Sequence, residues 1–199
     1  ISVKQINDET MHMLELAYEN VNQAFDQLLQ FSDKTDEQIY KREDTVNYLD
    51  KVISEYISTA LATPNLNINI SQALSSYYLM LVDIERISDY AVNMNHQATK
   101  RLQGDMTISE IEIVEHMKKL CVDMKNDLDD VEEAERKDDV IDSLVSSWRE
   151  AQIQALKQKK CSSEVSMMLS RIFTDFERIN DHALNVSQEL DKITVEIPD

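Results

Sequence analysis

Turn-forming residues are nearly absent from this sequence of 199 residues, which contains one glycine, Gly104, and two prolines, Pro64 and Pro198. A globular chain so poor in these residues is predicted to be all-helical. Glycine-rich phosphate loops of the Walker type are excluded, because they need more than one glycine. Apolar residues nevertheless make up 42% of the chain, which is enough for a sizeable hydrophobic core.

Basic residues are also scarce. Lysine and arginine number 20 against 38 aspartates and glutamates, which gives a formal net charge of −18. Nucleic-acid binding and direct docking on an anionic membrane both need a basic surface, so neither is expected. The surplus of carboxylates favours cationic partners instead, namely metal ions or the basic loops of another protein.

Cysteines and long apolar runs are few as well. Cys121 and Cys161 lack the spacing of a zinc site, and we expect both to be reduced thiols. The longest purely apolar run covers only 77–82, whereas a membrane-spanning helix needs about 20 residues. No signal peptide is evident, and the chain begins with Ile1, so we expect a fragment of a longer protein or a processed one.

The apolar residues that are present follow the helical period, and they do so twice. One stripe at 11–28 recurs at 114–131, a second at 39–60 recurs at 134–155, and a third at 80–98 recurs at 172–190. Apolar positions three and four residues apart are typical of amphipathic helices, so each half is predicted to contain three. The stripe at 134–155 is predicted to consist of Ala134, Ile141, Leu144, Trp148, Ala151 and Ala155.

These stripes predict an all-α fold of two tandem three-helix bundles, with six helices and a pseudo-twofold internal repeat. The repeats are placed at 1–103 and 104–199, with Pro64 separating the second and third helices. TDEQ at 35–38 and SEIE at 109–112 are interpreted as capping boxes. Two alternatives stay open for helices four and five, which either meet in a tight turn near 129–135 or run on as one bent helix.

One acidic motif occurs near the end of each half. ERISDYAVN at 85–93 and ERINDHALN at 177–185 each place a glutamate and an aspartate four residues apart, on one helix face. A helical wheel turns this face away from the apolar stripe. A solvated acidic surface therefore explains either copy taken alone.

The preceding helix of each half has the same spacing, in EDTVN at 43–47 and DDVID at 138–142. If the two helices are adjacent, their side-chain oxygens can surround a cation, and hard cations, iron and manganese accept such ligands. The predicted metal ligands are Glu43, Asn47, Glu85, Asp89, Asp138, Asp142, Glu177 and Asp181. The second half contains the fuller set of acids, so we expect metal there first.

The repeated motif resembles a known family signature. DIERISDYAVNM at 83–94 and DFERINDHALNV at 175–186, each late in a three-helix unit, resemble the PhoU family of phosphate-transport regulators. The resemblance spans essentially the whole chain, as two repeats, and implies paired three-helix bundles that negatively regulate phosphate uptake without being enzymes. It also implies surface metal clusters held by E(D)xxxD motifs, from which Asn47 departs because that position calls for an acid.

The resemblance further implies cofactors and partners. The metal would be divalent or ferric, as iron, manganese, nickel or zinc. The partner would be the transmembrane part of a phosphate transporter, in the same or another chain, at the cytoplasmic face of the cell membrane, and a homo-oligomer stays open. The missing initiator Met and the segments at 10–25 and 77–90 favour the cytoplasmic C-terminal domain of a bacterial sodium/phosphate cotransporter over a stand-alone regulator.

Two other functional classes compete with this interpretation. A carboxylate-bridged metalloenzyme of the ferritin-like kind needs two ExxH motifs, whereas ETMH at 9–12 is a lone one. A purely structural oligomerisation bundle is the third class. His182 is either a metal ligand or a partner of one, and Trp148 is expected to lie in the core.

Overall fold

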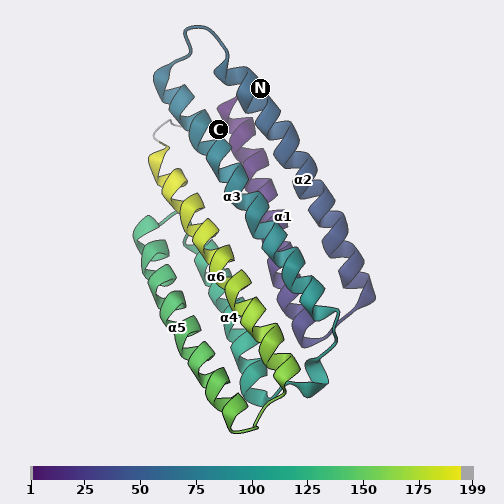
Figure 1. The fold of residues 1–199 in the computed structure, drawn as a ribbon. Helices are drawn as coiled ribbons and strands as arrows, with labels where there is room; N and C mark the ends of the chain where they lie inside the picture. Colours follow the sequence, from purple (N-terminus) through teal and green to yellow (C-terminus); the bar gives the residue numbers. More distant parts are fainter. Residues whose placement is uncertain (1, 194–199) are drawn as a thin grey trace.

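Six α-helices and no β-strand make up residues 2–193, the part of the chain that the computed structural model describes (Figure 1). The predicted all-α fold is confirmed, and none of the described helices is long and apolar enough to cross a membrane. Residue 1 and residues 194–199, the outer ends of the predicted repeats, lie outside the described part. The helices are α1 (Val3–Leu29), α2 (Asp33–Leu61), α3 (Ile68–Ala98), α4 (Ile108–Asn126), α5 (Val131–Lys157) and α6 (Ser163–Lys192).

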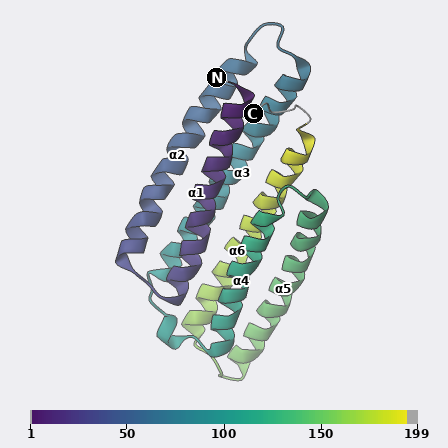
Figure 2. The ribbon, with the colours of Figure 1, turned by 180° about the vertical axis from the view of Figure 1, so that it is seen from behind.

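Helices α3 and α6 lie side by side at the centre of the molecule and run in opposite directions (Figure 1). The outer edges are formed by α2 and α5. Helices α1 and α4 lie behind the central pair in Figure 1 and in front of it in Figure 2. The first three helices therefore form one bundle, the last three form the other, and the two bundles pack through α3 with α6 and α1 with α4.

The buried apolar residues of the two bundles form one continuous core. Phe25 of α1 and Phe176 of α6 meet edge to face across the halves, with 6.4 Å between ring centroids, and both are fully buried. The predicted boundary between 103 and 104 falls inside the short 3-10 helix η1 (Gln103–Asp105). The boundary separates the two repeats in the sequence, but the hydrophobic core extends across both.

The helix starts lie earlier than the two capping boxes predicted. The N-cap of α2 is Ser32 rather than Thr35. For α4, the hydroxyl of Thr107 accepts from the backbone N–H of Glu110, and the Glu110 carboxylate accepts from the backbone N–H of Thr107 at 2.8 Å. A complete capping box at Thr107 leaves Ser109 in the first turn of the helix.

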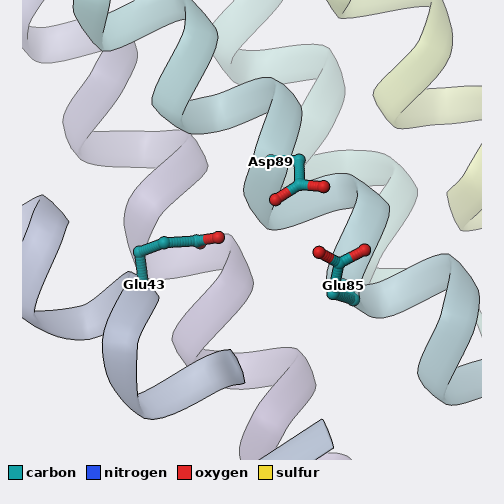
Figure 3. Close-up of side chains that lie close together, drawn as sticks. All are labelled: Glu43, Glu85 and Asp89. Atoms are coloured by element: carbon teal, nitrogen blue, oxygen red, sulfur yellow. The ribbon is translucent and has the colours of Figure 1, made fainter. Parts of the chain in front are cut away.

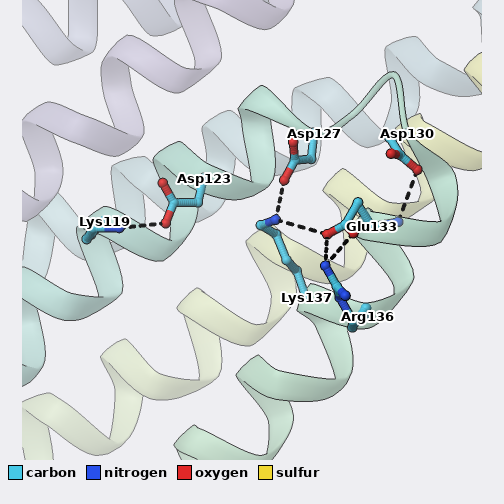
Figure 4. A network of polar contacts seen from close by, with 7 residues as sticks. All are labelled: Lys119, Asp123, Asp127, Asp130, Glu133, Arg136 and Lys137. Carbon is cyan, nitrogen blue, oxygen red and sulfur yellow. Dashed lines mark hydrogen bonds and ion pairs between the residues drawn. The ribbon is translucent and has the colours of Figure 1, made fainter.

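The open question about helices four and five is settled by a tight turn at 127–130. Asp130 caps α5, and Lys137 of α5 forms ion pairs with Asp127 after α4 and with Glu133 on its own helix (Figure 4). These contacts hold the first turns of α5 against the end of α4.

The predicted apolar stripe on α5 is only partly correct. Ala134 and Ile141 are buried, but the stripe continues through Val145 and Gln152, while Ala151 is exposed. Gln152 fits a core position because its amide donates to the buried carboxylate of Glu110 at 2.5 Å and to Ser166 at 2.6 Å. A pattern of apolar residues alone cannot reveal such a satisfied polar residue.

The shared core predicts the effect of one substitution. Replacing Phe176 with alanine should lower the free energy of unfolding by about 3–5 kcal/mol, because a fully buried ring is lost from the junction of the halves. Urea denaturation followed by circular dichroism measures the change. Met167→Ala, at a 65% exposed position of the same helix, should stay within about 0.5 kcal/mol and serves as the control. Equal effects of the two substitutions would contradict the shared core.

Candidate functional site

Three carboxylates from two helices of the first half meet at the α2–α3 seam. Glu43 of α2 points toward Glu85 and Asp89 of α3 (Figure 3). Each contributes one oxygen to a group whose members all lie within 4.8 Å of one another. We call this group cluster one. Its residues are half-buried in the seam between the helices. The helical wheel therefore placed them correctly outside the core, but they are less exposed to solvent than it predicted.

Burial and mutual repulsion make the charged forms of cluster one costly. Burial raises the pKa of Glu43 to about 7, a hydrogen bond from Ser88 opposes the shift, and Asp89 adds to it. Burial also raises the pKa of Glu85 to about 7, again with a contribution from Asp89. Opposed carboxylates without a cation between them favour the protonated form.

Two further α2 residues flank cluster one. Asn47, a predicted ligand, is exposed and its amide forms a hydrogen bond with Glu43 that lowers the pKa of this carboxyl. Asp50 was missed by the sequence analysis. It is half-buried, and burial together with Asp89 raises its pKa. Glu43, Asn47 and Asp50 follow steps of four and three, which keeps them on one face of the helix, and this spacing was the available signal.

The second half forms an equivalent group, which we call cluster two. Asp138 and Asp142 of α5 and Asp181 of α6 each offer an oxygen within 4.8 Å of the others. Burial raises the pKa of Asp138 to about 7, with additions from Asp142 and Asp181. Its Oδ1 atom is buried and has no hydrogen-bond partner within residues 2–193. An acceptor in this state is suited to a cation or a proton.

Glu177 does not belong to cluster two. Its carboxylate lies 3.7 Å from the guanidinium of Arg149 on α5. With Glu177 turned toward Arg149 and Asp50 added beside cluster one, the geometry gives the second half no advantage in acids. The expectation that metal binds there first stays a prediction.

Glu43 is held from inside the protein by a chain of buried polar groups. The hydroxyl of Ser88 donates to Glu43, and the amide of Asn20 donates to Ser88 at 3.4 Å. Arg42 donates to Asn20 at 2.8 Å. Ser88 and Asn20 are fully buried. In the second half Asn180 replaces Ser88 and donates to the carbonyl of Phe176 instead, so among the described residues cluster two has no equivalent chain of polar groups.

His182 joins the two halves rather than cluster two. Its Nδ1 atom lies 2.8 Å from Oδ1 of Asp83 on α3, and the amide of Asn185 donates to the same oxygen at 3.1 Å. The ring of Tyr90 stacks on His182 with 5.8 Å between centroids. Trp148 is half-buried and packs against the core, where it stacks on Phe173.

Both repeats match the family model of the PhoU domain, at residues 10–98 and 108–190. The chain belongs to the PhoU family. The fold agrees, since PhoU from Pseudomonas aeruginosa superposes with a TM-score of 0.84 at 18% identity, covering 95% of both chains. The phosphate transport system regulatory protein PhoU from Streptococcus pneumoniae gives a TM-score of 0.83 at 19% identity, covering 99% of this chain and 97% of that one.

A relative in Thermotoga maritima is named phosphate-specific transport system accessory protein PhoU homolog 1. It is 23% identical over 197 residues, which cover 93% of this chain and 84% of that protein. The residues of clusters one and two lie within the two stretches matched by the family model.

The raised pKa values predict how stability depends on pH in the absence of metal. Glu43, Glu85 and Asp138 have pKa values of about 7 when folded, against about 4 in an unfolded chain. Between these values the folded protein binds more protons than the unfolded one, so stability must fall as pH rises through this window. Calorimetry of chelator-treated protein should therefore show a Tm that decreases from about pH 5 to about pH 7.5.

A double variant provides the control for this pH dependence. Glu43→Gln with Asp138→Asn removes one titrating carboxyl from each cluster, so the decrease in Tm should become shallower. A Tm that rises over this pH range in the wild-type protein, or an unchanged slope in the double variant, would contradict the assigned pKa shifts.

Proposed function

We propose that this protein is a non-enzymatic regulator of phosphate transport that acts as an accessory to a membrane transporter. The match of both repeats to the PhoU domain carries the proposal. The Thermotoga maritima relative, which is named an accessory protein of a phosphate-specific transport system, supports it over nearly the whole chain.

The proposed partner is the transmembrane part of a phosphate transporter, at the cytoplasmic face of the cell membrane. A net charge of −18 suits contacts with basic loops of such a partner. The relatives from Thermotoga maritima and Streptococcus pneumoniae bear the names of accessory and regulatory PhoU proteins, which supports a regulator acting on a transporter of another chain. The sodium/phosphate cotransporter domain that the sequence favours has no such support and stays a prediction.

Removal of the gene should test regulation directly. In cells grown with ample phosphate, deletion is expected to raise the rate of phosphate uptake, because a negative regulator is lost, and expression of the wild-type chain should restore the low rate. Uptake of radiolabelled phosphate measures the effect. Uptake that responds normally to phosphate supply in the deletion strain would contradict the proposed function. An immunoblot of the parent cells distinguishes a stand-alone regulator from a domain of a cotransporter, since a cotransporter would give a band far above 23.0 kDa.

We further propose that clusters one and two bind metal ions. Each gathers three carboxylate oxygens, and cluster two contains a buried oxygen that has no hydrogen-bond partner among the described residues. One basic side chain approaches cluster two, since Arg178 lies 3.9 Å from Asp181. A cation would offset the burial and the repulsion that raise the pKa values of these carboxyls. An all-oxygen donor set suits iron or manganese better than zinc or nickel. We expect neither cluster to catalyse a reaction of oxygen or of phosphoesters.

Substitutions should remove metal from one cluster at a time. Asp89→Asn acts on cluster one and Asp181→Asn on cluster two, so each should lower the metal bound per chain by about half, and the double variant by nearly all. Mass spectrometry of purified, manganese-loaded protein gives the stoichiometry. Asp44→Asn, at an exposed position beside Glu43, should bind as the wild type does. Full metal content in the double variant would refute both assignments.

A further inference from the structure

A polar recess of about 360 Å³ opens at the seam between α3 and α6. Its lining comes from both halves of the chain and shares no residue with cluster one or cluster two. Its volume lies at the lower end of the range for pockets that bind small molecules. The lining residues used below are Gln97 and His96 on α3 and Ser170, Arg171 and Asp175 on α6.

Two hydrogen-bond acceptors in this recess have no partner. Gln97 is only 8% exposed, and its Oε1 atom is buried without a hydrogen bond within residues 2–193. Asp175 is half-buried, and its carboxyl takes part in no hydrogen bond or ion pair with the described residues. Because buried acceptors are normally satisfied, the Gln97 oxygen calls for a donor from outside the chain, and Asp175 offers a second acceptor in the same recess.

The internal repeat supplies a comparison for Asp175. Its counterpart in the first half is Asp83, as the first residue of the same motif. Asp83 is satisfied by His182 and Asn185, which reach it across the seam. At the Asp175 end the corresponding positions are occupied by Tyr90 and Asn93, and neither bonds to Asp175. Asp83 thus has hydrogen-bond partners at one end of the seam, which we call the closed end. Asp175 has none among the described residues at the other end, which we call the open end.

The open end offers donors of its own, namely a guanidinium, an imidazole and a hydroxyl. Arg171 and His96 both line the recess. Ser170 Oγ accepts from Arg149 at 3.2 Å, which leaves its own O–H free to donate. At the closed end the counterparts of Ser170 and Arg171 are Tyr78 and Leu79, which offer no cation.

We propose that this recess binds inorganic hydrogenphosphate, with Arg171, His96 and Ser170 donating to its oxygens and with Gln97 and Asp175 sharing the hydrogen bond that its one O–H group donates. The guanidinium of Arg171 favours an anion, and the unpartnered acceptors favour an anion that can itself donate a hydrogen bond. Hydrogenphosphate keeps a proton at neutral pH, whereas sulfate and most phosphomonoesters do not. The assignment deepens the proposed function by giving the regulator a phosphate signal, and it rests on that function for its biological meaning.

Selective binding is the first test. Chelator-treated, full-length protein is titrated with inorganic phosphate, sulfate or glycerol phosphate at constant ionic strength, by calorimetry and by NMR of side-chain N–H signals. Phosphate should bind saturably and shift the signals of Gln97 and Arg171. Sulfate and glycerol phosphate should bind at least about tenfold more weakly, because they leave the acceptors unpaired.

Three variants locate the binding. Arg171→Leu, which copies Leu79 of the closed end, should weaken phosphate binding at least about tenfold through loss of a charged donor. Asp175→Asn should bring the affinities for sulfate and phosphate to within a few-fold, because an amide can donate to either anion. Lys51→Leu removes an exposed cation from α2 and should leave phosphate binding unchanged.

Three results would overturn the assignment. They are the absence of saturable phosphate binding, equal binding of sulfate by the wild-type protein, and equal weakening by Arg171→Leu and Lys51→Leu. The deletion strain decides the proposed function separately. If regulation of uptake holds while phosphate fails to bind, only the assignment of the recess falls.

Discussion

The packing of α3 against α6 is the interaction on which the rest of the structure depends. These two helices carry the repeated motif, run in opposite directions, and bury their apolar stripes in a core shared by both bundles. Phe176 of α6 reaches across to Phe25 of α1, so neither bundle completes its core alone. Because the central pair is antiparallel and built from a repeat, the same motif positions recur at both ends of the seam, where Asp83 and Asp175 stand.

The outer helices α2 and α5 determine which side chains the carboxylates of the repeated motif face. Helix α2 packs beside α3, and α5 packs beside α6, so the carboxylates of each motif face a second acidic row in a half-buried seam. Burial, with repulsion from neighbouring carboxylates, raises the pKa of Glu43 and Asp138 to about 7. The central seam differs, since it combines basic and hydroxyl donors with unpartnered acceptors. The same fold would thus hold the two proposed metal sites and the proposed phosphate site.

The helices, their grouping in threes and most cluster residues could be predicted from the sequence, because apolar period and i,i+4 spacing are local properties. What could not be predicted depends on helix rotation and on partners distant in the chain. Glu177 has the expected spacing, yet it turns toward Arg149. Gln152 occupies a core position because Glu110 and Ser166 satisfy it. The seam recess is invisible in the sequence, because its lining comes from both halves.

Anomalous diffraction from crystals of the manganese-loaded protein tests the central claim most directly, since it locates bound ions without reference to activity. The account predicts one manganese site or group of sites between Glu43, Glu85 and Asp89, and another between Asp138, Asp142 and Asp181. Anomalous peaks absent from both clusters, in crystals of protein that has been saturated with manganese, would contradict it.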